Sequence, residues 1–155
     1  MFGECHAHML MDGIDYREAV KLHRECVCES KIREYFEAYR RAGVSFVRDG
    51  GDNCGVSRRA AQLAGEYGID YRTLVFAIHK EGHYGRIVGR SFDNMRESHQ
   101  RVREAAAEGA DFIKIMTTGL LDFRNHGEIT DTPLDKAEVK EMVHIAREEG
   151  FAVMS

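Results

Sequence analysis

Residues 111–116, DFIKIM, carry a lysine in the middle of an otherwise apolar run. Side chains alternate between the two faces of an extended strand, so Phe112, Lys114 and Met116 share one face and the two isoleucines share the other. A parallel strand is buried on both faces and is normally a nearly continuous apolar run. The run therefore predicts a buried parallel strand, in which an unpaired ammonium group would be costly.

Strand and helix patterns alternate on both sides of this run. Glycines follow four of the helical patterns, at the position where glycine commonly ends a helix. Ser30 and Ser57 are the expected N-caps of two helices. The predicted strands are 2–5, 44–47, 71–77, 111–116 and 151–155, and the predicted helices are 15–24, 30–41, 57–67, 92–108 and 134–149.

Strands that are joined by helices indicate parallel βα units with right-handed crossovers. Such units close in one of two ways, as an open doubly wound sheet or as a (β/α) barrel. A complete barrel needs about 250 residues, and this chain has 155. The expected fold is α/β, a partial (β/α)8 TIM barrel of about the first four βα units plus the start of strand five.

The composition is that of an ordinary soluble globular protein. Hydrophobic residues make up 43% and charged residues 31% of the chain, and the formal net charge is −4. The chain has no dense basic block for nucleic acid, no apolar run long enough for a membrane span and no signal-peptide pattern. Its four cysteines include no CxxC pair. We therefore expect reduced thiols and a cytoplasmic location.

His6 and His8 lie at the end of the first predicted strand, separated by one residue. Residues two apart on a strand share a face, so the two imidazoles lie side by side. Neutral imidazole nitrogens bind zinc, and catalytic groups gather at the carboxyl ends of barrel strands. The pair therefore indicates a divalent metal site. The alternative is two surface histidines near a chain end.

Lys114 adds a second candidate group at a carboxyl end. Burial lowers a lysine pKa and makes the amine nucleophilic. A neutral amine adds CO2 to form a carbamate, which is an anion with two oxygens able to bridge two cations. Two alternatives stay open: a side chain that reaches past the strand end into water, and a Schiff-base lysine, which would need no histidine pair.

Three segments together resemble the metal-dependent amidohydrolase superfamily. They are ECHAHM on strand one, VRDGG on strand two and GADFIKIMTTG on strand four, and the last residues, EEGFAVMS, resemble the segment that leads to a strand-five histidine. The branch most similar to the chain is that of imidazolonepropionases and metal-dependent dipeptidases. The resemblance extends over essentially all 155 residues.

The resemblance implies a (β/α)8 barrel with one or two divalent metals, usually zinc. It implies that His6 and His8 bind the more buried metal and that carboxylated Lys114 bridges both ions. Histidines on strands five and six and an aspartate on strand eight would complete the set. The metals would generate hydroxide from a bridging water, which attacks an amide-type carbonyl or an amidine carbon.

The chain departs from the family pattern in two ways. Strand one begins almost at residue 1, without the N-terminal part of the small β-sandwich that many members carry. The chain also ends before the strand-five histidine. We expect residues 1–155 to be the N-terminal portion of one barrel domain, truncated, inactive alone and prone to pair through its exposed strand edges as a homo-oligomer.

The loop after strand three, HKEGHYG, supplies the candidate substrate-binding residues His79, His83 and Tyr84. Asp49 ends strand two and either faces the site or orients a loop. The other pocket candidates lie in the long loop after strand four: Thr117, Thr118, Gly119, Arg124 and His126.

The leading function is hydrolysis of C–N bonds by a metal-activated water. A metal-dependent phosphoesterase that also opens with His-x-His is the alternative enzyme. Lys114 separates the two classes, because the phosphoesterase site needs no strand-four lysine. A non-catalytic fragment is the alternative outside enzymes.

Overall fold

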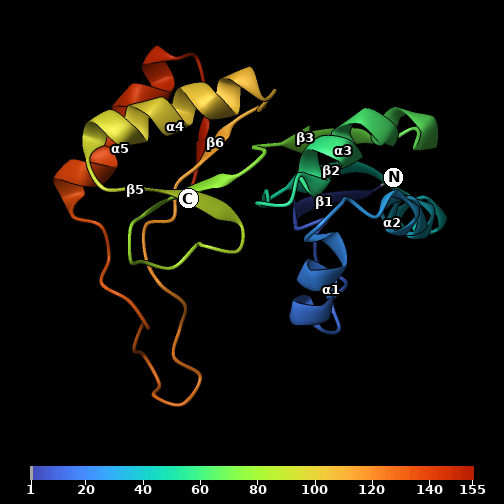
Figure 1. Ribbon diagram of the computed structural model, residues 1–155, viewed down its shortest axis with the longest axis horizontal. Coiled ribbons are helices and arrows are strands. Elements are labelled where there is room, and N and C mark those ends of the chain that lie inside the picture. The colour runs from blue at the N-terminus through green and yellow to red at the C-terminus, as the bar shows by residue number, and fades with distance from the viewer. Residues whose placement is uncertain (1) are drawn as a thin grey trace.

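The computed structural model describes residues 2–155 as a mixed α/β structure (Figure 1). All four pairings between its strands are parallel, as the alternation of elements predicted. The strands are β1 (Phe2–Ala7), β2 (Val44–Asp49), β3 (Asp70–Thr73), β4 (Ala77–Lys80), β5 (Gly89–Phe92), β6 (Ile113–Lys114) and β7 (Val153–Met154). The helices are α1 (Tyr16–His23), α2 (Glu29–Arg41), α3 (Val56–Leu63), α4 (Met95–Ala107) and α5 (Lys136–Glu148), with a 3-10 turn η1 (Ala64–Tyr67).

The strands form three short sheets, β1-β2-β3, β4-β5 and β6-β7. A parallel bridge between Ile78 and Ile115 places β4 beside the run that contains β6. At the other end of that run, the Asp111 N–H donates to the Thr73 carbonyl at 2.7 Å, which ties it to β3. Segments that follow one another along the chain therefore lie beside one another, as expected for successive βα units.

The predicted third strand, 71–77, is wrong as a single element, because β3 and β4 are separate strands. Between them, the Phe76 N–H donates to the Leu74 carbonyl at 2.8 Å in a turn centred on Val75, whose φ is 67°. A β-branched residue is unfavourable there. Its side chain is nevertheless buried, and its carbonyl accepts from Asp52 N–H at 2.9 Å. Tertiary contacts thus outweigh the local preference of valine for extended backbone.

Two helix starts differ from the prediction. Cys28, not Ser30, is the N-cap of α2. Gly55, not Ser57, is the N-cap of α3. The carboxylate of Asp52 accepts from the N–H groups at the start of α3, and Ser57 lies buried inside its first turn. An aspartate upstream therefore performs the capping role that the sequence suggested for a serine.

Strand β5 was not predicted, because GRSF has little apolar character. It pairs with β4 through close backbone approach at Gly89. A Cβ at this position would lie 2.8 Å from the carbonyl carbon of Ala77. The pairing therefore depends on the absence of a side chain rather than on an apolar pattern.

Helices cover the inner strands on one side, and a smaller apolar cluster lies on the other side of β4 and of the run that contains β6. Helices α4 and α5 lie side by side and cover β4 and β6, whereas α2 and α3 cover β2 and β3 (Figure 1). On β6, Ile113 packs with the α4–α5 cluster, and Phe112 packs with the small cluster on the opposite face. The alternation predicted for residues 111–116 is therefore confirmed.

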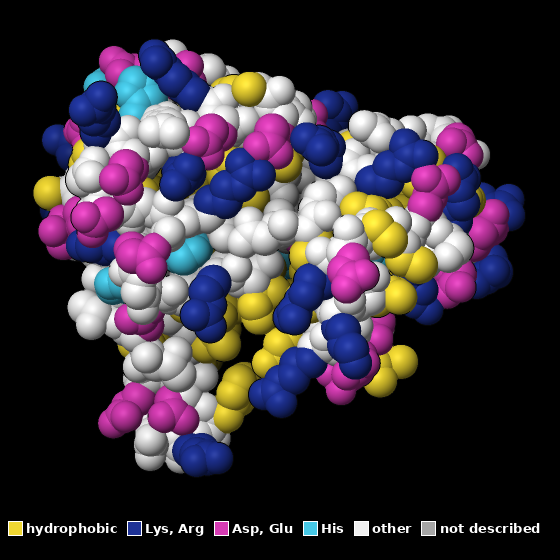
Figure 2. Space-filling view, viewed as in Figure 1, with side chains coloured by type: hydrophobic (Ala, Val, Ile, Leu, Met, Phe, Trp, Pro, Cys, Tyr) yellow, Lys and Arg dark blue, Asp and Glu magenta, His cyan; other side chains and the backbone are white. Residues whose placement is uncertain are grey.

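The face shown in Figure 2 has apolar side chains along a hollow beside the projecting loop 117–133. That loop is held by an antiparallel bridge between Leu121 and Ile129 and exposes Phe123 almost completely. All four cysteines are free. Within residues 2–155, no helix combines the length and apolar character needed to cross a bilayer.

Candidate metal centre

The His-x-His pair lies at the carboxyl end of β1, which is an edge strand of the first sheet. The centroids of the His6 and His8 rings are 5.3 Å apart, and the ring planes are inclined by 52°. His6 is exposed and His8 is half-buried. The pairing of β1 with β2 becomes irregular between Glu4 and Ala7. The two imidazoles therefore adjoin each other where the regular ladder ends.

Lys114 lies at the end of β6 and is 5% exposed. Its Nζ atom is 2.9 Å from Nε2 of His6. Within residues 2–155, this imidazole is the hydrogen-bond partner of the amine. Burial lowers the pKa of the Lys114 ammonium, and the negative charge of Asp49 opposes that shift. A lysine buried against an imidazole rather than a carboxylate is thus biased toward the neutral amine.

The electrostatics of His6 point the same way. Although His6 is exposed as a whole, partial desolvation of its ring lowers the pKa of the imidazole, and the positive charges of Lys114 and His8 lower it further. Metal ions bind the neutral imidazole. The centre therefore favours protonation states in which nitrogen lone pairs are available.

The half-buried ring of His8 is held by the turn that follows β2. Its Nδ1 atom lies 2.9 Å from the carbonyl oxygen of Gly51. Gly50 lies directly against the ring, because a Cβ there would be 2.6 Å from Nε2 of His8. A hydrogen bond from one ring nitrogen to a carbonyl is a common way to orient a metal-binding histidine.

Asp49 does not face the centre directly. It is fully buried, and its two carboxylate oxygens accept hydrogen bonds from donors in four different segments. The donors are Met9 N at 2.8 Å, Gly51 N at 2.5 Å, Ser57 Oγ at 2.7 Å and Tyr71 Oη at 2.6 Å. Of the two roles considered for Asp49, the orientation of a loop is the one that these contacts support.

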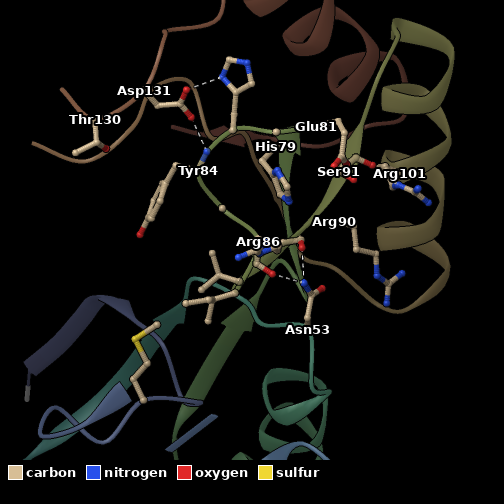
Figure 3. A pocket seen from close by; sticks show the side chains of 17 residues that line it. Asn53, His79, Glu81, Tyr84, Arg86, Arg90, Ser91, Arg101, Thr130 and Asp131 are labelled. Carbon is tan, nitrogen blue, oxygen red and sulfur yellow. Dashed lines mark hydrogen bonds and ion pairs between the residues drawn. The ribbon is translucent and has the colours of Figure 1, made fainter. Parts of the chain in front are cut away.

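The three candidate substrate-binding residues line one cavity of about 810 Å³ on the loop between β4 and β5. In Figure 3, His79 lies at the centre of the view, with Tyr84 on one side and Ser91 on the other. His79 is 4% exposed, and its Nδ1 lies 3.0 Å from the Lys80 carbonyl oxygen. His83 lines the same cavity.

The loop between β4 and β5 is tied to the long loop across this cavity. Asp131 accepts a hydrogen bond from the Tyr84 N–H at 2.7 Å (Figure 3). The Nδ1–H of His83 donates to the Thr132 carbonyl at 3.0 Å. On the inner side, Asn53 donates to the Arg86 carbonyl at 2.8 Å. The wall that carries Tyr84 is therefore held from two sides.

The cavity and the metal centre are separate groups of residues. His6, His8 and Lys114 do not line the cavity. The other candidates of the long loop lie elsewhere: Thr117 bonds to Ser155 through their hydroxyl groups, and Arg124 and His126 are exposed. The sequence missed Gly50 and Gly51 as parts of the site, because a DGG turn is common in any α/β protein.

The side chains of this centre can hold a divalent ion on one condition. Within residues 2–155, no three His, Cys, Asp or Glu side chains are arranged to hold a metal. Two adjoining imidazoles are present, but an unmodified ammonium cannot serve as a third ligand. Carboxylation of Lys114 would convert the third group into an oxygen ligand, so the fit depends on that modification.

These features define a parallel α/β protein with two histidines and a buried lysine that converge at the carboxyl ends of β1 and β6. No family model matches the chain, and no curated protein matches it either. Comparison with solved structures, in contrast, finds the same fold in hydrolases.

Three of these structures are a prolidase complexed with N-methylphosphonate-L-proline (TM-score 0.71, 20% identity), an amidohydrolase (0.69, 22%) and the ochratoxinase of A. niger (0.69, 18%). The match covers 99% of this chain for the prolidase and 97% for the other two. The chain spans only 41% of the length of each of those structures. The resemblance to amidohydrolases is therefore confirmed for the fold.

Proposed function

We propose that this chain is part of a metal-dependent hydrolase of C–N bonds, with an amide, cyclic amide or amidine as substrate. The observation that carries the proposal is the 2.9 Å contact between Nζ of Lys114 and Nε2 of His6, beside His8. The similarity of the fold to solved structures of an amidohydrolase and a prolidase supports a hydrolase. A phosphoesterase with a His-x-His motif would have no use for the lysine.

In this proposal, His6 and His8 are ligands of a divalent metal, with zinc the expected ion because imidazole suits it well. The ion would supply an activated water nucleophile and polarise the scissile carbonyl. The chain's own contribution is orientation: the Gly51 carbonyl fixes the His8 ring, and Lys114 adjoins His6.

Lys114 is proposed to react with CO2. The neutral Nζ forms a bond to the carbon of CO2 and loses one proton to solvent, which leaves a carbamate anion with two oxygens. Burial supports this reaction, because it lowers the pKa of the ammonium and raises the fraction of neutral amine. The product replaces a buried cation with an anion that a metal would neutralise.

The cavity between β4 and β5 is proposed to hold part of a small-molecule substrate. The His79 Nδ1–H donates to a carbonyl, so its Nε2 carries a lone pair that accepts a hydrogen bond from a substrate N–H or O–H group. His83 and Tyr84 would contact the substrate from the same loop. The long loop that borders this cavity would close its outer side.

Residues 1–155 are proposed to supply about four βα units of a (β/α)8 barrel and the start of its fifth strand, within one domain. The remaining units would supply the other metal ligands. We therefore expect the 155-residue chain to be inactive by itself and to associate through its strand edges.

The experiment measures zinc binding by calorimetry and carbamate formation by ¹³C NMR in ¹³C-labelled bicarbonate. We expect a carbamate signal in the unaltered chain and none in Lys114→Met. Lys140→Met, at an exposed lysine of α5, is the matched control and should keep the signal. His6→Ala and His8→Ala should each weaken zinc binding at least tenfold. A carbamate signal that persists in Lys114→Met, or histidine variants that bind zinc normally, would refute the proposal.

A further inference from the structure

The buried carboxylate of Asp49 holds both segments that flank the His8 ring. Its Oδ2 accepts from the backbone N–H of Met9, the residue directly after His8. Its Oδ1 accepts from the backbone N–H of Gly51, whose carbonyl in turn bonds to Nδ1 of His8. One carboxylate thus fixes the main chain beside His8 and the peptide group that receives its ring.

These contacts close a circuit that runs from the His8 ring through Gly51 and Asp49 to Met9 and back to His8. Each link is at most 2.9 Å long. The carbonyl of Gly51 can only accept, so Nδ1 of His8 must carry the hydrogen. The other ring nitrogen, Nε2, is left with a free lone pair.

Close packing restricts the turn between β2 and α3, so the Gly51 peptide group has little freedom to leave these hydrogen bonds. Gly51 has a φ of 80°, and a Cβ there would lie 2.8 Å from a methyl carbon of Leu74. Gly50 lies against the His8 ring itself. The two other Asp49 donors, the hydroxyl groups of Ser57 and Tyr71, come from α3 and β3 and fix the carboxylate to the rest of the fold.

We propose that Asp49 is a positioning residue that sets the tautomer and the orientation of His8, so that Nε2 keeps a lone pair available to a metal ion. This inference rests on the proposed function for its biological meaning, but the tautomer itself is a property of the metal-free protein. Asp49 acts through His8 and touches neither metal nor substrate.

The variant Asp49→Asn tests the inference, because it keeps the shape of the side chain. An amide has one accepting oxygen, so its NH2 group must face either Met9 N–H or Gly51 N–H, neither of which can accept. One link of the circuit is then lost, whichever way the amide lies. Tyr71→Phe is the matched control: it removes a hydrogen bond to the same carboxylate but leaves the circuit intact.

The first measurement is long-range ¹H–¹⁵N NMR of the His8 ring without metal, at mildly alkaline pH. We expect a single Nδ1–H tautomer in the unaltered chain and in Tyr71→Phe, and a mixture of both tautomers in Asp49→Asn. Zinc affinity should fall by about 10- to 100-fold in Asp49→Asn, the usual effect of losing a residue that orients a ligand. It should stay within about threefold in Tyr71→Phe.

A purely structural Asp49 would give a different result, because both variants would then lose stability while His8 kept its tautomer. That outcome would overturn the inference. The same holds if the unaltered chain carries the His8 hydrogen on Nε2, a result that needs no variant to fold. If zinc does not bind the unaltered chain, the proposed function fails, whereas the tautomer measurement still decides the role of Asp49.

Discussion

The amine of Lys114 and the imidazole of His6 are 2.9 Å apart, although 108 residues separate them in the chain. No local interaction brings them together. His6 comes from β1, at the edge of the first sheet, and Lys114 comes from β6, which pairs with β7 in the third sheet. Their contact is set by the arrangement of the parallel strands.

The buried lysine is expected to make stability depend on pH. Its folded-state pKa is lowered from the value of 10.5 that lysine has when unperturbed. Between the folded-state pKa and 10.5, the unfolded chain binds a proton that the folded chain does not, so stability rises with pH across this window. Lys114→Met removes that dependence and should raise the free energy of unfolding near neutral pH by roughly 1 to 3 kcal/mol.

Urea unfolding of both proteins at several pH values in CO2-free buffer measures this effect. The stability advantage of Lys114→Met should shrink as pH rises. An advantage that is constant with pH would show that the amine titrates as it does in the unfolded chain.

A methyl group at Gly50 is expected to disturb the His8 ring without unfolding the chain. A Cβ there would lie 2.6 Å from Nε2 of His8, so the ring must move. We expect Gly50→Ala to weaken zinc binding at least tenfold. Gly65→Ala is the matched control, because a Cβ at Gly65 meets nothing within 4 Å.

Calorimetric zinc titration of the two glycine variants gives the comparison. Equal affinities would mean that the His8 ring is not part of the metal site, or that it moves aside at no cost.

Removal of the Asp131 carboxylate is expected to loosen the wall of the cavity. This group accepts the Tyr84 N–H from the facing loop. Asp131→Ala should therefore speed hydrogen exchange at the Tyr84 amide by about tenfold, which corresponds to about 1.4 kcal/mol, a typical hydrogen bond. Asp122→Ala is the control, because the Asp122 carboxylate accepts hydrogen bonds from Arg124 and Asn125 of its own loop. Exchange at Tyr84 that responds equally to both variants would contradict the tie between the loops.

The capping box of α5 is expected to contribute measurably to stability. Asp135 accepts from the Glu138 N–H at 2.8 Å, and the Glu138 carboxylate accepts from the Asp135 N–H at 3.1 Å. Asp135→Ala should lower the free energy of unfolding by about 1 kcal/mol. Glu141→Ala, at an exposed position of the same helix, should change it by less than about 0.5 kcal/mol. Thermal or urea unfolding measures both, and equal effects would argue against the cap.

Much of the secondary structure follows from local patterns. The helices α2, α4 and α5 begin and end within three residues of their predicted bounds, because glycines and apolar spacing are local signals. The break between β3 and β4 was not predictable, because it depends on a bond from Asp52 to Val75. Strand β5 was also missed because of a long-range contact: its pairing requires the backbone of Gly89 to lie directly against Ala77.

The candidate site, too, was predictable from the sequence only in part. Alternation along residues 111–116 was enough to predict that Lys114 shares a face with Phe112 and Met116, because strand geometry has a fixed period of two. The burial of Asp49 and the separation of the His79 cavity from the histidine pair came only from the structure. No sequence pattern indicates that one carboxylate accepts hydrogen bonds from four donors in four separate segments.

The sequence by itself determined the alternation of strands and helices, the adjacent positions of His6 and His8 on one strand face, and the face that Lys114 shares with Phe112 and Met116. The tertiary structure alone decided which distant groups meet: Lys114 with His6, and Asp49 with Met9 and Gly51. The physical reason is the distance along the chain over which each interaction acts. Periodicity and capping act over a few residues, whereas burial and strand pairing join groups that are far apart in the chain.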